Sequence, residues 1–285
     1  MKGFKGGITM RDQVTEIGKG SIIQHGKHND RIYLIRLCED DLGIILQSIS
    51  NLAKENDYSK IFCKVPKYIA PLFFADGYIL EAYIPAFFNN KEDVFFLSKF
   101  LNSDRLRNIE HSQLKKLHNL LTENMNGTPK VNSAYKVRIL SGSDVPQMTE
   151  IYSEVFKSYP FPIHNPEYIL KTMQEDVVYF GAEKNGKLAA LASSEIDREA
   201  GNAEMTDFAT HPAYLGNRLS GILLRSMEEE MKEQGIHTLY TIARLNSLPM
   251  NKTFLRNKYR YSGTLIKNTN ISGRIESMNV YYKHL

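Results

Sequence analysis

The alternation of apolar and polar positions is clearest in the second half of the chain. Residues 135–140 have the pattern of a strand, and two helices are expected at 145–156 and 166–177, with a proline-rich loop between them. Three strands follow, the first two joined at residues 185–186 by an Asn-Gly pair typical of a type I′ turn. An amphipathic helix ended by Gly235, a strand, a helix and two strands complete the predicted order βααβββαβαββ.

The first half of the chain repeats part of this pattern. Residues 60–84 match 238–266 as a strand, a helix opened near a proline, a polar turn with a tyrosine and another strand, and 92–100 then match 276–284. The segment 40–57 is not preceded by a recognisable strand and glycine turn. We therefore expect the first half to have no counterpart of the loop that precedes the amphipathic helix. Two alternative explanations of this partial repeat stay open: a degenerate duplication of one domain, or the shared physics of α/β folds.

The two halves meet at a segment with the composition of a linker. Asn, Gly, Thr and Pro cluster at 123–134, between a helical pattern and a new strand. We therefore predict an N-terminal α/β domain at 1–132 and a second α/β domain at 133–285.

Composition narrows the class of protein. The 285 residues are 42% hydrophobic and 24% charged, which is typical of a folded protein with a large core. A net charge of +4 spread along the chain does not indicate nucleic-acid binding, but it suits a phosphate-rich ligand. Cys38 and Cys63 lack metal-ligand spacing, and no apolar run approaches the ~20 residues of a membrane span. We expect a cytoplasmic protein without a metal site or a membrane partner.

One loop has the features of a phosphate-binding site. Residues 209–231 (ATHPAYLGNRLSGILLRSMEEEM) lead from a strand through a loop with Gly216 and Gly221 into a helix. Main-chain N–H groups and the dipole at a helix N-terminus favour bound phosphate. Arg218 and Ser220 stand where a tighter loop would carry glycine, so a simple strand–helix connector is the alternative.

The element order and the stretch THPAYLGNRLSGILL together resemble the GNAT superfamily of acetyl-CoA-dependent N-acetyltransferases, over residues 135–285. The family's loop pattern is Arg/Gln-x-x-Gly-x-Gly/Ala, and this chain departs from it at Leu215, Arg218 and Ser220. The long N-terminal region and the stretches SYPFPIHNPEYI, AEMTDFAT and SMNVYYKHL are similar to GNAT enzymes that act on β-lysine. The resemblance implies a mixed, mostly antiparallel central sheet flanked by helices, preceded by an α/β domain for which a degenerate GNAT-like half is one explanation.

The resemblance also implies where acetyl-CoA, the expected cosubstrate, binds. Its pantetheine arm would pair with the main chain of the strand before the loop, and the loop would hold its diphosphate. Asn246 and Asn251 match positions that often bind the arm, although helix capping is the alternative for Asn246. The implied cofactor-binding residues are Phe208, Ala209, Thr210, Leu215, Gly216, Asn217, Arg218, Leu219, Ser220, Gly221, Asn246 and Asn251.

Acetylation requires a base, because an amine is protonated near neutral pH. Glu204 and Asp207 are the candidate carboxylates on the central strand, with Glu204 favoured. Regular alternation places them on opposite faces unless a bulge intervenes; ion pairing with a neighbouring Lys or Arg is the alternative role of each. Phe254 stands where many relatives place the tyrosine that protonates the CoA thiolate. Tyr259 or Tyr261 would replace it, or the thiolate leaves without a protein acid.

The resemblance points to the ε-amine of β-lysine as the acetyl acceptor, giving the compatible solute Nε-acetyl-β-lysine, used in osmoadaptation. Tyr159, Phe161 and His164 in the proline-rich loop would line the acceptor site, although packing or turn roles are the alternatives. The first half would shape that site or form a homodimer interface. Other small amines, a peptide N-terminus, and a non-catalytic acyl-CoA sensor remain alternative functions.

Overall fold

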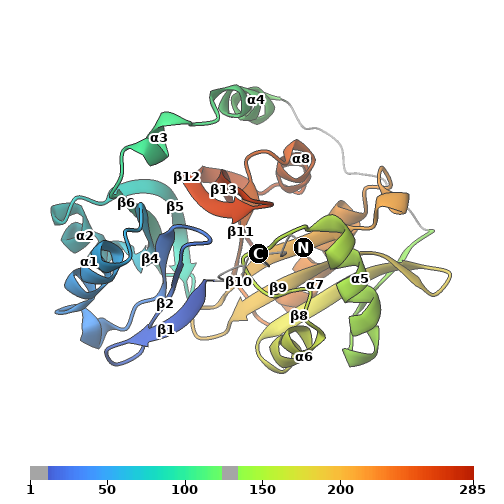
Figure 1. The fold of residues 1–285 in the computed structure, drawn as a ribbon. Coiled ribbons are helices and arrows are strands. Elements are labelled where there is room, and N and C mark those ends of the chain that lie inside the picture. The colour runs from blue at the N-terminus through green and yellow to red at the C-terminus, as the bar shows by residue number, and fades with distance from the viewer. Residues whose placement is uncertain (1–11, 124–133) are drawn as a thin grey trace, which may run out of the picture.

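The computed structural model describes residues 12–123 and 134–285. The predicted linker at 123–134 and the boundary at 132 lie outside these ranges, apart from the linker's two end residues. The division into two domains therefore stays a prediction. The strands of the described chain form two sheets, which lie beside each other in Figure 1.

The first sheet is built from the first half of the chain. Its strands are β1 (Gln13–Ile17), β2 (Ser21–Gly26), β3 (Arg31–Arg36), β4 (Lys60–Pro66), β5 (Ile79–Phe88) and β6 (Glu92–Phe100). The helices of this half are α1 (Ile45–Glu55), α2 (Ala70–Ala75), α3 (Asp104–Arg107) and α4 (His111–Thr122). The six strands run in the order β1-β2-β3-β4-β6-β5.

The second sheet is built from the second half. Its strands are β7 (Lys136–Ile139), β8 (Val177–Lys184), β9 (Lys187–Asp197), β10 (Asn202–Thr210), β11 (Thr238–Arg244), β12 (Arg260–Ile271) and β13 (Arg274–His284). The helices are α5 (Val145–Val155), α6 (Pro166–Gln174), α7 (Leu219–Glu233) and α8 (Leu248–Arg256). The sheet order is β12-β13-β11-β10-β9-β8-β7, and the predicted succession βααβββαβαββ is confirmed.

The first half repeats the topology of the second more fully than the sequence indicates. The order β1-β2-β3-β4-β6-β5 corresponds strand by strand to β8-β9-β10-β11-β13-β12. In each sheet the third and fourth strands are the parallel pair, and a helix, α1 or α7, connects them. The expectation that no strand precedes the segment 40–57 was wrong, because β3 does. All of its residues except the exposed Arg36 are buried or half-buried, which hides the alternation that marks a one-sided strand.

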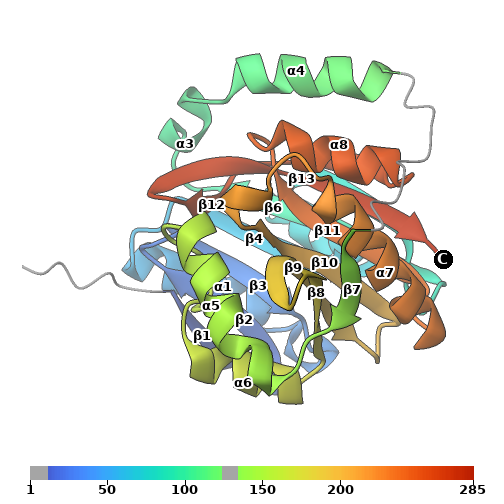
Figure 2. The ribbon, with the colours of Figure 1, turned by 90° about the vertical axis from the view of Figure 1, so that its right-hand side faces the viewer.

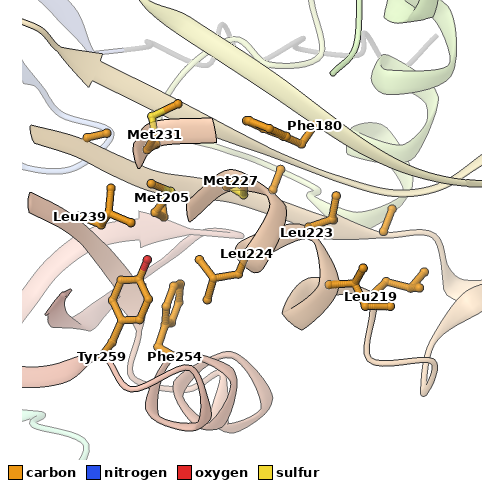
Figure 3. Close-up of a cluster of buried hydrophobic side chains, with 14 of the residues drawn as sticks. Phe180, Met205, Leu219, Leu223, Leu224, Met227, Met231, Leu239, Phe254 and Tyr259 are labelled. Carbon is orange, nitrogen blue, oxygen red and sulfur yellow. The ribbon is translucent and has the colours of Figure 1, made fainter. Parts of the chain in front are cut away.

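The amphipathic helix α7 supplies much of the core of the second half. Figure 3 shows Leu219, Leu223, Leu224 and Met227 packed toward the sheet. Gly235 follows the helix with φ 75°, and the turn at Asn185 and Gly186 has φ values of 53° and 75°, so both predicted turns are confirmed.

The two sheets share a hydrophobic cluster. It joins Phe62, Phe87 and Phe96 of the first sheet to Tyr240 and Val280 of the second. Strands β5 and β12 approach so closely that a Cβ on Gly263 would lie 2.0 Å from the carbonyl oxygen of Glu81. Because a glycine is required there, any larger residue would force the sheets apart. The cavities between the sheets therefore have walls from both halves of the chain.

Candidate functional site

Strands β10 and β11 separate where the site lies. They pair in parallel only from Asn202 with Thr238 to Glu204 with Tyr240, although both strands continue. Beyond Glu204, the side of β10 that faces β11 is paired with no strand of the described chain. The gap leaves main-chain groups of β10 available to a ligand.

A bulge in β10 brings the two candidate carboxylates to one cavity. The register with β9 shifts between Thr206 and Ala209, and Asp207 has a left-handed φ of 55°. Asp207 turns out of the regular alternation, so Glu204 and Asp207 both line the cavity described below. The expectation that they face opposite sides, unless a bulge intervenes, is thus resolved by the bulge.

The gap between β10 and β11 forms a pocket of about 230 Å³. Phe208 and Phe254 lie on its wall, with ring centroids 5.7 Å apart, and Tyr159 and Asp207 lie at its inner end. Ala209 is buried on the opposite face of β10, within the core beneath α5. A narrow pocket with an exposed strand edge suits an extended chain that pairs with main-chain groups.

A larger pocket of about 680 Å³ lies at the N-termini of α7 and α8. Thr210 and every residue of the 215–221 loop except Asn217 line it, and the Asn217 side chain instead bonds the Tyr214 carbonyl at 2.9 Å. Gly216 and Arg218 both have left-handed φ values, of 84° and 59°, which turn the main chain into the helix. This is the geometry expected of a loop that presents N–H groups to an anion.

Basic side chains surround this larger pocket. They come from three elements that are distant in sequence: Lys116 of α4, Arg218 of the loop, and Lys252 and Arg256 of α8. Helix α4 lies alongside α8, as Figures 1 and 2 show, so the first half of the chain also reaches this pocket. Four cations against the single carboxylate of Glu123 favour a polyanionic ligand.

The structure does not bring Asn246 or Asn251 into these pockets. Asn246 is exposed on the turn before α8, and the residue at the N-cap of α8 is Ser247. The buried Asn251 amide donates to the carbonyls of Arg244 and Ser247, and its oxygen accepts bonds from Asn279 and Tyr281. Asn251 therefore ties α8 to the sheet and has no hydrogen-bonding group left for a ligand.

The candidate proton donor Tyr259 also lies away from the gap. Its buried hydroxyl is beside Glu228 of α7, and burial, followed by the Glu228 charge, raises its pKa well above the usual value. Tyr261 bonds Thr264 at 2.6 Å, and Phe254 occupies the wall of the gap. The described part of the chain therefore places neither tyrosine where it can protonate a group in the gap.

A third pocket, of about 280 Å³, lies between the two sheets and opens into the gap. We call it the intersheet pocket. Tyr159, Thr206, Asp207 and Ile242 line both spaces. The remaining polar wall of the intersheet pocket comes from both halves of the chain: Gln24, Arg31, Tyr33, Lys64, Glu195, Glu204, Tyr240, Asn268 and Thr269.

Three carboxylates meet in the intersheet pocket. Glu195 of β9 stands directly opposite Glu204 of β10, and Asp207 accepts hydrogen bonds from the hydroxyls of Tyr159 at 2.5 Å and Ser193 at 2.7 Å. Lys64 reaches this group from the first sheet and donates to the Tyr240 hydroxyl at 3.2 Å. Like charges directly opposite each other on neighbouring strands are unfavourable. The arrangement is therefore one that a bound cation would stabilise.

The protonation of these carboxylates reflects their enclosure. Glu195 is exposed, and its side chain lines the pocket. Desolvation by the surrounding pocket walls, followed by the charges of Glu204 and Asp207, raises its pKa well above the usual value. Desolvation also raises the pKa values of Glu204 and Asp207, and Lys64 opposes the shift at Glu204. Carboxylates with raised pKa values are suited to accept a proton near neutral pH.

The proline-rich loop covers one end of the intersheet pocket. Tyr159 and Phe161 lie on its wall. His164 does not; its Nε2 lies 2.8 Å from the carbonyl oxygen of Phe156 and closes the loop on the end of α5. No group of three or more His, Cys, Asp or Glu within the described residues is arranged to hold a metal ion. Within the same ranges, no helix is long and apolar enough to cross a membrane.

Comparison with known proteins identifies the family. Residues 145–257 match the model of the acetyltransferase (GNAT) family. The chain is 40% identical to the β-lysine N(6)-acetyltransferase of Methanococcus maripaludis, over 95% of this chain and 98% of that protein. The chain belongs to the GNAT family of acetyltransferases.

Two further acetyltransferases are similar, one to about half of the chain and the other to nearly all of it. The β-lysine N(6)-acetyltransferase of Methanosarcina mazei is 35% identical over 55% of this chain and 58% of that protein. The N-acetyltransferase YodP of Bacillus subtilis is 27% identical over 97% of this chain and 100% of that protein. The expected fold class and enzyme class are thereby confirmed.

The sequence analysis missed several polar residues of this GNAT site. Glu195 has a detectable signal, because it alternates with Ser193 along a strand whose next neighbour carries Glu204. Lys64 also has one, since a lysine within the apolar run KIFCKV must find a polar partner. Arg31 and Lys116 have no local signal, because their place in the site depends on how distant elements pack.

Replacing Glu195 by Gln should stabilise the ligand-free GNAT enzyme at neutral and alkaline pH. Because the pKa of Glu195 is raised on folding, the folded state holds the Glu195 proton more tightly than the unfolded state does. As pH rises from the ordinary glutamate value of 4.5 through the raised pKa, the ionisation of Glu195 therefore lowers the free energy of unfolding. We expect a melting temperature about 1–3 °C higher at pH 8. The difference should shrink toward pH 4, where the group is protonated in both states.

Thermal denaturation of the native protein and of Glu195→Gln between pH 4 and pH 8 measures the effect. The matched substitution Glu199→Gln changes an exposed carboxylate outside the pocket and should leave the curve unchanged. A Glu195→Gln protein that is less stable than the native protein at pH 8 would contradict this account of the cluster.

Proposed function

We propose that this enzyme transfers the acetyl group of acetyl-CoA to the ε-amine of β-lysine, giving Nε-acetyl-β-lysine. The observation that carries the proposal is the charge of the intersheet pocket. Three carboxylates and two basic side chains line it, a formal net charge of −1. β-Lysine has two ammonium groups and one carboxylate at neutral pH, a net charge of +1. Full-length similarity to the Methanococcus maripaludis β-lysine N(6)-acetyltransferase supports the same acceptor.

Acetyl-CoA is expected to occupy the two outer pockets. The diphosphate would bind main-chain N–H groups of residues 216–220, since that of Gly221 already donates to the Arg218 carbonyl at 3.2 Å. Its charge suits Arg218, Lys252 and Arg256 around the larger pocket. The pantetheine arm would extend along the unpaired edge of β10 at Phe208, Ala209 and Thr210. The thioester would then lie near Asp207, where the gap opens into the intersheet pocket.

The reaction would proceed by direct transfer. Glu204 takes a proton from the ε-ammonium, directly or through water, and the free amine attacks the thioester carbonyl. A main-chain N–H at the β10 bulge holds the negative oxygen that forms, a contribution of roughly 3 kcal/mol in an enclosed site. The C–S bond then breaks, CoA leaves as the thiolate, and the acylated nitrogen loses its second proton to water. The thiolate takes a proton from solvent, because Tyr259 and Tyr261 lie elsewhere.

Glu204 suits the role of base better than Asp207. Each Asp207 oxygen already accepts a hydroxyl bond, one from Tyr159 and one from Ser193, and the residue is 8% exposed. Glu204 is only half-buried and faces the pocket. Asp207 is then a positioning residue, which sets the bulge and adds negative charge beside the ammonium.

The proposed product has chemistry that fits a compatible solute. Acetylation converts one ammonium of β-lysine into an amide, so a cation becomes a net-neutral zwitterion. A net-neutral solute can accumulate without adding charge to the cell. We extend the proposal to this physiological role and to a cytoplasmic location.

Incubation of the protein with acetyl-CoA and β-lysine tests the function. We expect release of free CoA thiol in equal amount to a product whose acetyl group NMR places on the ε-nitrogen. L-Lysine, spermidine and a peptide with a free N-terminus serve as competing acceptors. Efficient transfer to one of these but not to β-lysine would replace the proposed acceptor. CoA binding without turnover on any amine would favour a sensor.

A further inference from the structure

Three carbonyls of β12 each meet a buried cation from the first half of the chain. The register of β12 with β13 shifts between Leu265 and Thr269, which turns this stretch toward the first sheet. The carbonyl oxygen of Ile266 accepts a bond from Lys60, that of Lys267 from Arg105, and that of Asn268 from Arg31. The three cations are thus held in equivalent ways.

Arg31 differs from the other two cations in lacking a carboxylate partner. Lys60 pairs with Glu81 at 2.8 Å, and Arg105 pairs with Asp30 at 3.5 Å. Arg31 is 4% exposed and forms no ion pair within the described residues. Its Nε has no hydrogen-bond partner there either. A buried guanidinium without an anion is costly, because burial removes water that would otherwise solvate the charge.

Two more unpartnered polar groups lie on the same wall. Gln24 is 2% exposed and Asn268 is 1% exposed, and the side-chain oxygen of each has no partner in the described structure. Both residues, like Arg31, line the intersheet pocket. One donor and two acceptors without partners therefore surround one end of this cavity. A ligand that supplies an anion and a donor would satisfy all three.

This polar end is separate from the carboxylate cluster. Tyr33 lies two residues after Arg31 on β3, and the Arg31 guanidinium lies 5.4 Å from the centre of its ring. Burial, followed by the charge of Glu204 and more weakly that of Glu195, raises the pKa of Tyr33. Tyr33 thus stands between Arg31 and the carboxylates, and an elongated ligand with different charges at its two ends would span the pocket.

We propose that Arg31, Gln24 and Asn268 form the subsite for the zwitterionic end of the acceptor amino acid. The Arg31 guanidinium binds the carboxylate, and the amide oxygens of Gln24 and Asn268 accept bonds from the β-ammonium. The distal amine then lies among Glu195, Glu204 and Asp207. Because the polar atoms are sealed from water in the ligand-free protein, binding includes a small movement of these side chains. This inference rests on the proposed function.

The subsite is tested by acceptors that differ only in the carboxylate. Pentane-1,4-diamine is β-lysine without that group, and 3,6-diaminohexanamide replaces it with a neutral amide. We expect the native enzyme to prefer β-lysine over both. In Arg31→Gln, kcat/KM for β-lysine should fall by at least about tenfold, while kcat/KM for pentane-1,4-diamine stays within about twofold. The preference for the carboxylate should therefore be lost.

Arg105→Gln is the matched control. It removes a second buried cation from a neighbouring carbonyl of β12, and Arg105 does not line the intersheet pocket. We expect it to lower the melting temperature but to keep the acceptor preference. Gln24→Leu provides a second test that leaves Arg31 and its bonds in place, should Arg31→Gln fail to fold. Because Gln24 would contact the β-ammonium, this change should weaken β-lysine and pentane-1,4-diamine alike but leave 6-aminohexanoate, which lacks the β-amine, within about twofold.

The outcomes separate the subsite from the function. A native enzyme that acetylates β-lysine and pentane-1,4-diamine equally well overturns the subsite and leaves ε-acetylation in place. Equal losses on β-lysine and pentane-1,4-diamine in Arg31→Gln, or equal losses on β-lysine and 6-aminohexanoate in Gln24→Leu, also overturn it. A native enzyme inactive on β-lysine overturns the proposed function, and the subsite with it.

Discussion

Replacing Glu204 by Gln should lower kcat for β-lysine by about 10²–10⁴-fold, the usual contribution of a positioned general base. Gln keeps the size of the side chain but cannot take the proton from the acceptor ammonium. Steady-state kinetics with thiol detection measures the loss. KM for acetyl-CoA should change little, because Glu204 does not line either of the two pockets proposed for that cosubstrate.

The pH profile distinguishes a base from a residue that only shapes the site. Desolvation raises the pKa of Glu204, so the native acid limb should lie above the ordinary glutamate value of 4.5, with kcat/KM rising as the group loses its proton. In Glu204→Gln this limb should vanish, and activity should follow the small fraction of acceptor that is already neutral. Asp207→Asn, which keeps a residue type that tolerates the left-handed φ, should retain the limb. A Glu204→Gln enzyme with the native profile would contradict the assignment.

Replacing Gly221 by Asp should raise KM for acetyl-CoA by about 100-fold or more. Gly221 is in the first turn of α7 and lines the larger pocket, where a new carboxylate would face the CoA diphosphate. Like charges brought together in a binding site cost several kcal/mol. The fold should tolerate the change, because a Cβ there meets only the Asn257 amide, at 3.9 Å, and an acidic residue is favourable at a helix N-terminus.

Gly221→Asn is the matched control for shape. It adds nearly the same volume without the charge, so we expect a rise in KM of about tenfold, with the remainder of the Asp effect due to repulsion. Isothermal titration with CoA gives the same comparison without the acceptor, and melting curves report on the fold. If both proteins bind CoA like the native enzyme, the diphosphate lies elsewhere.

The second half of the chain could be predicted from sequence because its signals are local. Apolar periodicity places α7, and the Asn185-Gly186 pair fixes a two-residue turn. The phosphate-loop candidate needed only a strand end, glycines and a helix start, which all lie within residues 209–221. The element order follows from these local rules together with short connections.

The intersheet pocket could not be predicted in the same way. Its walls combine Arg31 and Lys64 with Glu195 and Asn268, which are far apart in the chain and meet only when the two sheets pack. The bulge at Asp207 falls where the alternation of β10 breaks, at the polar pair Thr206 and Asp207, and that break alone does not define which way the Asp207 side chain turns. Asn251 matched a ligand-binding position by spacing, but its bonds to Asn279 and Tyr281 belong to tertiary packing. Long-range contacts of this kind leave no periodic trace.

The intersheet pocket is lined by both sheets, so the proposed site divides catalysis and acceptor choice between the two halves of the chain. In the proposed site, Glu204 and the β10 main chain that would hold the oxyanion lie on the second sheet, whereas two of the three subsite residues, Arg31 and Gln24, belong to strands of the first. Substitutions in β2 and β3 can therefore alter which amino acid is chosen without disturbing the chemistry of transfer. Diversification of acceptor choice among related enzymes should concentrate in those two strands.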